Sequence, residues 1–346
     1  MSEICGKKLF NPFAEEEQKL FCGETTNILD LSTVKYPYFI EWVNKTYANN
    51  WLPEKVSNMA EDKYQYSNDL TADEKDAYDT ELSFLIFLDS LQTNNLPNIA
   101  EYITLPEVVY ALARQTYEEA IHSRSYGYIL INAVGQESMH KIVYKYKEDE
   151  TLLHRNEFIA TIYEECSKER NAKNFLRDLI ANYLLEGLYF YNGFNFFHNL
   201  AYRGLMMATN IQISYIRRDE NSHLALFKKL IKIFKQELPN DFDTDLVYDM
   251  FKQAVEWEKR FSLSTLGNKI TGISEKTITD YTHYIANKRL KDIGLEPIFP
   301  KAENPYKHLD KFASVDGDET TNRANQFEVT SITYKDPSIL DGWDEI

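Results

Sequence analysis

The sequence predicts an all-α protein, and three features support this fold class. Apolar residues recur at helical spacing over most of residues 36–292, and no alternating apolar and polar run is long enough to indicate a dominant strand. The pattern Glu-x-x-His occurs twice within such stretches, at Glu119–His122 and at Glu220–His223. A length of 346 residues allows two domains or one large bundle, and we expect the bundle.

The N-terminal part of the chain predicts an arm followed by three helices. Residues 1–34 mix charge, Gly and Asn without a sustained period, which indicates an extended arm. A short helix is expected over residues 36–47, before Pro53. A second is expected over residues 71–92, because Thr71-Ala-Asp-Glu74 is a capping-box pattern. After a loop containing Pro97, a third is expected over residues 106–132.

The remaining elements follow from the same periodicity. Further helices are expected over residues 157–166, 172–198, 201–236, 244–266 and 275–292, the last entered by Ser274. From Pro300 the pattern dissolves into polar residues, which predicts a flexible C-terminal tail. We therefore expect an arm over residues 1–34, a helical domain over residues 35–299 and a tail over residues 300–346.

One face of the third helix carries polar residues where a core is expected. Gln115, Glu119, His122 and Tyr126 follow one another at spacings of four, three and four residues, and Val108 lies on the same stripe. Burying an unpaired carboxylate costs several kcal/mol, so these groups need a partner. A metal ion satisfies a carboxylate and an imidazole together.

Four further residues complete a metal-ligand set. Glu220 and His223 repeat the pattern on another apolar helix, and Glu186 and Asp89 are lone acids in apolar helices. Two helices with Glu-x-x-His and two with one carboxylate each form the ligand set of four-helix di-iron or di-manganese sites. A single Glu-x-x-His is a weak signal, but four acids and two histidines on apolar faces together predict a metal site.

Composition excludes several classes of protein. The formal net charge of −16 and the absence of a basic stripe argue against nucleic-acid binding, so protein or small-molecule partners are expected. Neither a secretion signal nor an apolar run of 18 residues is apparent, so we expect a cytoplasmic protein without a membrane span. The three cysteines form no C-x-x-C pair, which argues against a zinc ribbon.

These motifs resemble a known family. The segments that carry the likeness are Asn50-Trp51-Leu-Pro-Glu54, Asp89, Glu119-Ala-Ile-His-Ser-Arg-Ser-Tyr126, Leu185-Glu-Gly-Leu-Tyr-Phe-Tyr-Asn-Gly-Phe194 and Ile216-Arg-Arg-Asp-Glu-Asn-Ser-His223. Together they resemble the small, radical-generating β subunit of class I ribonucleotide reductase. The resemblance covers most of the chain and implies a ferritin-like helical bundle with extra helices.

The resemblance implies roles for individual residues. It pairs Asp89 with His122 at one metal and Glu186 with His223 at the other, with Glu119 and Glu220 available to bridge. Tyr126 matches the tyrosine that is oxidised to a stable radical. The resemblance also implies that Phe190, Phe194 and Ile216 form a pocket that shields Tyr126. It implies that Asp219 is an acid that links His122 to Trp51. In the tail, it implies that Tyr334 is a relay tyrosine and Glu328 its proton partner.

The resemblance also implies cofactors and partners. It implies two iron ions per chain, with manganese or a mixed pair using the same ligand types, and O2 as the oxidant. It implies a homodimer and docking of the large, α subunit through the C-terminal tail, where the acidic stretch 336–346 contains Trp343. The product would be deoxyribonucleotides, made by reduction of ribonucleotides.

Two other functions use a similar bundle. A ferritin-like di-iron oxidase or hydroxylase of small apolar substrates would need an open channel to the metals instead of a plug of Phe190, Phe194 and Ile216. A non-catalytic iron store or a helical interaction protein is the third possibility.

Overall fold

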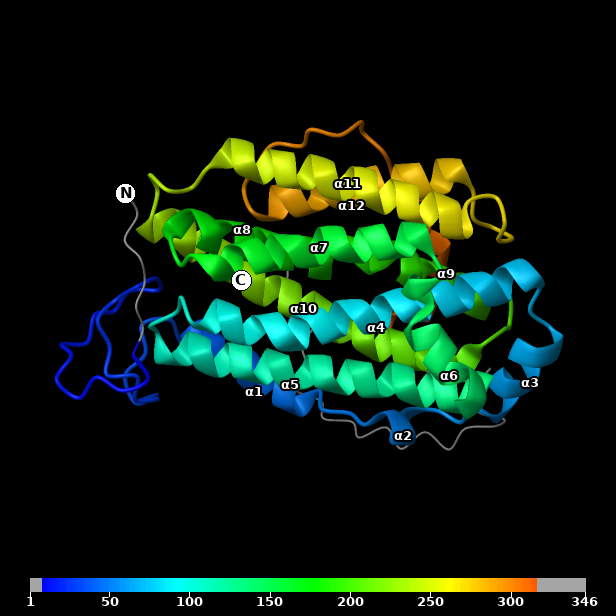
Figure 1. The fold of residues 1–346 in the computed structure, drawn as a ribbon, viewed down its shortest axis with the longest axis horizontal. Coiled ribbons are helices and arrows are strands. Elements are labelled where there is room, and N and C mark those ends of the chain that lie inside the picture. Colours follow the sequence, from blue (N-terminus) through cyan, green and yellow to red (C-terminus); the bar gives the residue numbers. More distant parts are fainter. Residues whose placement is uncertain (1–7, 316–346) are drawn as a thin grey trace.

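The computed structural model describes residues 8–315, and all regular secondary structure in this range is helical (Figure 1). The prediction of an all-α fold is confirmed. Within the same range the β-type pairing is one isolated bridge between Phe21 and Ile103. The elements are α1 (Pro37–Ala48), α2 (Pro53–Val56), α3 (Ala60–Asn68), α4 (Ala72–Ala100), α5 (Pro106–Ile129), η1 (Leu130–Val134), α6 (Gln136–Val143), η2 (Lys145–Lys147), α7 (Glu150–Lys168), α8 (Ala172–Leu184), η3 (Leu185–Tyr189), α9 (Tyr191–Tyr202), α10 (Met207–Glu237), α11 (Thr244–Leu266), α12 (Glu275–Asp292), η4 (Lys307–Leu309) and α13 (Asp310–Ala313).

Four long stretches form the centre of the bundle: α4, α5, α10 and the run from α8 through η3 to α9. α4 packs against α5 and α8, and α10 packs against the same two helices. On the outside, α1 covers α5 and α10, α7 covers α4 and α8, and the pair α11 and α12 covers the α8–η3 side (Figure 1). The side chains that these four stretches direct toward one another therefore lie in the centre of the bundle, beneath the outer helices.

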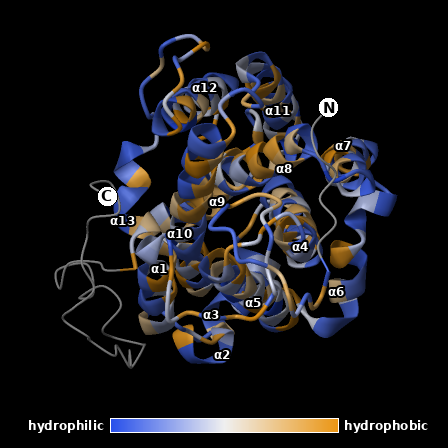
Figure 2. Cartoon of the chain, turned by 90° about the vertical axis from the view of Figure 1, so that its left-hand side faces the viewer, coloured by the Kyte–Doolittle hydropathy of each residue, from blue (hydrophilic) through white to orange (hydrophobic). Residues whose placement is uncertain are grey.

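The run from α8 through η3 to α9 has almost no exposed face. Every residue of α9 from Tyr191 to Ala201 is buried, and so is nearly all of α8. A helix that is buried all round belongs in the interior of a bundle. Figure 2 shows the hydrophobic residues gathered toward the middle of the bundle and the hydrophilic ones toward its outside. A polar side chain on these helices is therefore placed in the core.

The stretch predicted as one helix over residues 172–198 is interrupted by a π-helical turn. α8 ends at Leu184, η3 spans Leu185–Tyr189, and α9 begins at Tyr191. A π-helical turn contains an extra residue, and such turns are frequent at functional sites. Gly187 lets two side chains pack closely on the turn, because a Cβ there would lie 2.8 Å from a side-chain carbon of Leu224 and 3.0 Å from Arg289 Nε. The turn carries Glu186, and the periodicity of the sequence gave no sign of it.

Two helices are longer than predicted. α4 continues to Ala100, with Pro97 inside it, although we expected it to end near residue 92. Proline removes one helical hydrogen bond, but the last turns bury Leu96 and Ile99 completely, and this burial offsets the loss. α7 begins at Glu150 rather than near residue 157, because the Asp149 side chain caps it by accepting a hydrogen bond from Leu152 N. The short helices α3 and α6 were not predicted.

The predicted N-terminal caps of two helices are confirmed. Thr71 and Glu74 form a reciprocal capping box at the start of α4, and Ser274 and Thr277 form one at the start of α12. The bounds of α11 and α12 agree with the predicted ranges.

Both ends of the described chain lie against the body. In the arm, the backbone N–H of Leu20 donates to Glu237 of α10 at 2.8 Å. Near the other end, the carbonyl of Phe312 accepts from Asn210 Nδ2 at 3.0 Å and Ser214 Oγ at 2.8 Å. The first part of the predicted tail therefore packs on α10. Among the described helices none has the length and apolar character that a membrane span requires.

The start of α10 depends on a side chain from α3. Met206, the residue before the helix, has a left-handed φ of 52° and provides no cap. Asp62 takes this role: it accepts from the backbone N–H groups of Ala208 (3.1 Å) and Thr209 (2.6 Å) and from the Thr209 hydroxyl (2.7 Å). These donors are buried, so their hydrogen bonds are costly to lose.

We predict that Asp62→Ala lowers the free energy of unfolding by about 2 kcal/mol, because three buried donors lose their acceptor. Urea denaturation followed by circular dichroism measures this. Asp69→Ala, at the exposed C-terminal end of α3, is the matched control and should change stability by less than about 0.5 kcal/mol. Equal denaturation midpoints for the two variants would contradict the assigned role of Asp62.

Candidate metal centre

The six side chains predicted as metal ligands meet in the core of the bundle. α5 supplies Glu119 and His122, and α10 supplies a second pair with the same spacing. α4 and the π-helical turn η3 each add one carboxylate. All six side chains are completely buried: Asp89, Glu119, His122, Glu186, Glu220 and His223.

The six residues form two overlapping groups. Within each group, one ligand atom per residue can be chosen so that all of them lie within 4.8 Å of one another. Asp89 and His122 belong to the first group and Glu186 and His223 to the second, whereas Glu119 and Glu220 belong to both. The two shared residues could therefore contact two ions at once.

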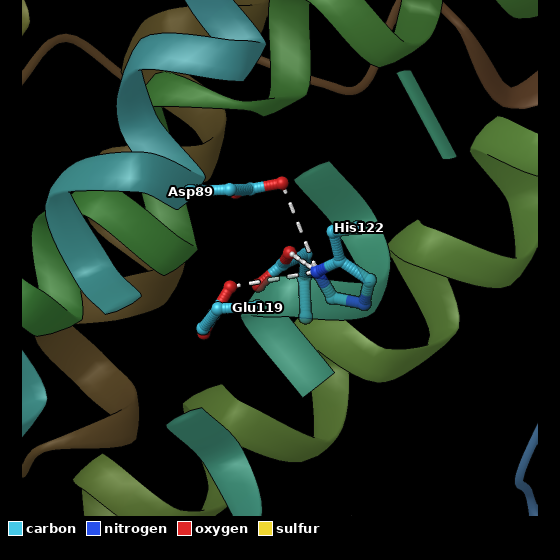
Figure 3. A group of neighbouring side chains, drawn as sticks. Asp89, Glu119 and His122 are labelled. Carbon is cyan, nitrogen blue, oxygen red and sulfur yellow. Dashed lines mark ion pairs between the residues drawn. The ribbon is translucent and has the colours of Figure 1, made fainter. Parts of the chain in front are cut away.

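In the first group the His122 imidazole faces three carboxylates. Its Nδ1 lies 3.8 Å from Asp89 Oδ2, 3.4 Å from Glu119 Oε2 and 3.1 Å from Glu220 Oε1. Figure 3 shows Asp89 and Glu119 directed toward this nitrogen from two different helices.

The second group repeats this arrangement around His223. Its Nδ1 lies 3.2 Å from Glu119 Oε1, 3.1 Å from Glu220 Oε2 and 3.5 Å from Glu186 Oε2. Each of the shared glutamates thus directs one oxygen to each histidine. The centroids of the two imidazole rings are 5.8 Å apart.

The donor set fits a pair of divalent metal ions. Buried atoms that make no hydrogen bond within the described residues occur on Asp89 (both oxygens), Glu119, His122, Glu186 and Glu220. Burial raises the pKa of Asp89 and of Glu186 well above the ordinary value, and the neighbouring carboxylates add to this for Glu186. Cations would remove the repulsion between the carboxylates and satisfy the orphaned atoms. Carboxylate and imidazole ligands suit iron and manganese alike.

The outward nitrogen of His122 faces an acid, as the resemblance implied. His122 Nε2 lies 3.3 Å from Asp219 Oδ2, and Trp51 Nε1 donates to the same oxygen at 2.6 Å. Arg218 donates to the other oxygen at 3.0 Å. Burial raises the pKa of Asp219, but the charge of Arg218 and the hydrogen bonds from His122 and Trp51 outweigh it and hold this pKa below the ordinary value. The ionised acid can accept the Nε2 proton, which leaves Nδ1 free to bind a metal.

His223 has an equivalent partner that the sequence analysis missed. Its Nε2 lies 3.1 Å from Glu118 Oε2, and Arg114 donates to Glu118 Oε1 at 2.9 Å. Glu118 directly precedes a metal-ligand candidate and is nearly buried. The spacing of Arg114 and Glu118 indicates an ion pair along one helix. It does not indicate that Glu118 faces a histidine of another helix.

Tyr126 lies in a dry part of the same core. Its side chain is completely buried, and its hydroxyl makes no hydrogen bond within the described residues. Burial, followed by the charges of Asp89 and Glu220, raises the pKa of Tyr126 well above the ordinary value. The residues that the resemblance assigned to a shielding pocket are also completely buried: Phe190, Phe194 and Ile216.

Tyr334 and Glu328 lie outside the described residues, so their predicted roles have no structural test. Gln115, which the sequence placed on the same face as Glu119, lies beside Glu119 and Glu186.

Comparisons with known proteins agree with this geometry. Residues 29–305 match the family model described as ribonucleotide reductase, small chain. The chain is 41% identical over 299 residues to a ribonucleoside-diphosphate reductase subunit beta of Treponema pallidum, covering 85% of each chain. It is 31% identical to the corresponding subunit of Halalkalibacterium halodurans over the whole length of both.

Solved structures extend the comparison to the fold. The ribonucleotide reductase R2 subunit from Clostridium botulinum superposes with a TM-score of 0.86 at 40% identity, covering 91% of this chain and 100% of that one. A dimanganese(II)-NrdF from Streptococcus sanguinis superposes with a TM-score of 0.72 at 20% identity, which supports the fold alone. The predicted ferritin-like bundle is therefore confirmed, and no comparison favours the oxidase or storage alternatives. The chain belongs to the ribonucleotide reductase small-chain family and is a subunit of the oxidoreductase ribonucleoside-diphosphate reductase.

Proposed function

We propose that the six buried carboxylate and imidazole groups bind two metal ions, and that the chain uses them with O2 to store a radical on Tyr126. The observation that carries this proposal is the sharing of Glu119 and Glu220 between two ligand groups in the core that also contains the buried phenol. In this assignment Asp89 and His122 hold one ion, and Glu186 and His223 hold the other. Two iron ions are proposed, and manganese or a mixed pair would use the same ligands.

When bound, the metal pair supplies the electrons that reduce dioxygen and so provides an oxidant for a nearby phenol. The residues of the chain provide the surroundings. Asp219 and Glu118 each face the Nε2 of one ligand histidine, so that both imidazoles present Nδ1 to the centre. The elevated pKa of Tyr126 keeps the phenol protonated until an electron is removed. Its burial keeps the resulting radical away from solvent and from reductants dissolved in it.

Trp51 and Asp219 are proposed as the first part of the route by which the oxidising equivalent leaves the core. The hydrogen-bonded series from His122 through Asp219 ends at Trp51, which is partly exposed. Tyr334 in the tail is proposed as the next relay residue, with Glu328 as its proton partner. From there the equivalent would reach the large subunit, which reduces ribonucleotides to deoxyribonucleotides.

Family membership implies two protein partners, a second copy of the chain and the large subunit. We propose that the large subunit docks on the C-terminal tail, because the acidic stretch with Trp343 is a suitable peptide ligand for a partner groove. The cytoplasmic location stays a prediction.

The first prediction concerns the ligands. The apoprotein should bind two ferrous ions per chain, and replacing both shared carboxylates in a Glu119→Ala, Glu220→Ala variant should reduce this to at most one weakly held ion, because each proposed site then loses two ligands. Anaerobic equilibrium dialysis with metal analysis measures the occupancy. Two tightly held ions in the double variant would remove the assignment.

The second prediction concerns Tyr126. Tyr126→Phe keeps the ring volume in the dry pocket, so the variant should fold and bind two ions normally. After ferrous loading and exposure to oxygen it should lack the tyrosyl radical signal of the wild-type chain in a frozen-solution electron paramagnetic resonance spectrum. A matched control is Tyr183→Phe, which removes another buried hydroxyl, one that donates a hydrogen bond to the carbonyl of Arg289. This variant should retain the radical signal. A wild-type signal in Tyr126→Phe would place the oxidant on another group.

The third prediction separates storage from transfer. Tyr334→Phe should show the full radical signal, because the tail takes no part in oxidation at the metals, but nucleotide reduction should fall to background when the large subunit is added. Deleting residues 336–346 should also preserve the signal and lose activity, but excess large subunit should partly restore that activity, because docking rather than relay is impaired. Full activity of Tyr334→Phe would exclude this residue as the relay.

A further inference from the structure

One oxygen of Glu186 accepts hydrogen bonds from two amides, and a phenol donates to one of those amides. Gln92 of α4, Gln115 of α5 and Tyr163 of α7 are all buried. The side-chain N–H groups of Gln92 and Gln115 both donate to Glu186 Oε1, the latter at 2.9 Å. The phenol of Tyr163 donates to Gln92 Oε1 at 3.1 Å. Three helices thus converge on a single carboxylate.

These contacts make the two oxygens of Glu186 unequal. Oε1 accepts from two amides, whereas Oε2 makes no hydrogen bond within the described residues and lies 3.5 Å from His223 Nδ1. An oxygen that already accepts two hydrogen bonds has little lone-pair density left for a cation. Oε2 is therefore the oxygen that faces the proposed metal.

Tyr163 determines which end of the Gln92 amide faces Glu186. An amide offers a donor at one end and an acceptor at the other. Burial raises the pKa of Tyr163 well above the ordinary value, so the phenol keeps its proton and acts as a donor. The carbonyl of Gln92 must then turn toward Tyr163, and its NH2 group toward Glu186. Rotation of the amide by a half-turn would place its oxygen against Glu186 Oε1 and its NH2 group against the phenol O–H. The phenol and the carboxylate therefore favour the same orientation of Gln92, and loss of the phenol removes one of these two restraints.

We propose that Tyr163 and Gln92 are positioning residues, which hold Glu186 so that it offers only Oε2 to the metal bound with His223. This rests on the metal site of the proposed function. Tyr163 contacts Gln92, and Gln92 contacts Glu186, so the effect of Tyr163 on Glu186 depends on Gln92. Gln115 ties the same carboxylate to the bridging candidate Glu119, to which it donates at 3.1 Å.

Anaerobic titration of the full-length apoprotein with cobalt(II) tests this, with visible absorption of the bound ion as the readout. Tyr163→Phe and Gln92→Leu should each weaken one of the two binding steps about tenfold and shift the absorption bands of that ion, with the other step unchanged. The double variant should bind cobalt no more weakly than Gln92→Leu alone, because the phenol no longer has an amide to orient. Tyr183→Phe, the control for loss of a buried hydroxyl, should bind both ions as the wild type does.

Thermal unfolding of each apoprotein, followed by circular dichroism, checks that the variants are folded. A folded Tyr163→Phe variant with wild-type isotherms and spectrum would overturn this proposal alone. Additive losses in the double variant would overturn the series from Tyr163 through Gln92. Failure of the wild-type chain to take up cobalt would overturn the metal site itself, and this proposal with it.

Discussion

The structure depends on the electrostatic cost of placing four carboxylates and two imidazoles in the dry core of a helical bundle. Such groups are stable there only with compensating charge and hydrogen bonds. Part of the compensation comes from the protein: Gln92 and Gln115 donate to Glu186, and the acids Asp219 and Glu118 face the Nε2 atoms of the two histidines. The orphaned oxygens that face the centre would be satisfied by the proposed metal ions.

The two halves of the centre follow one design. Each histidine directs Nδ1 to carboxylates and Nε2 to an acid that is itself held by an arginine. The halves differ in what lies beyond that acid. Asp219 also accepts a hydrogen bond from Trp51, which is partly exposed. Glu118 accepts one from Arg114, which also donates to the Thr46 hydroxyl in α1. In one half the acid is thus hydrogen-bonded to a partly exposed tryptophan, and in the other the acid is connected through Arg114 to α1.

The π-helical turn gives the Glu186 half its particular geometry. An extra residue in η3 places Glu186 between the amides of α4 and α5 on one side and His223 on the other. The turn is stabilised from outside, since Arg289 of α12 donates to the carbonyl of Gly187 at 3.0 Å. The outer helices thus contribute to the site without providing a ligand.

The sequence by itself determined the all-α class, the helix starts at Thr71 and Ser274, and the identity of all six metal-ligand candidates. These follow from local spacing, because residues three or four apart share a helical face and a polar residue on an apolar face must lie in the core. Only the tertiary structure decided that Glu118 faces His223, that Tyr163 reaches Glu186 through Gln92, and that α4 continues through Pro97. The first two join different helices and the third depends on burial against neighbours, so helical periodicity contains no record of them.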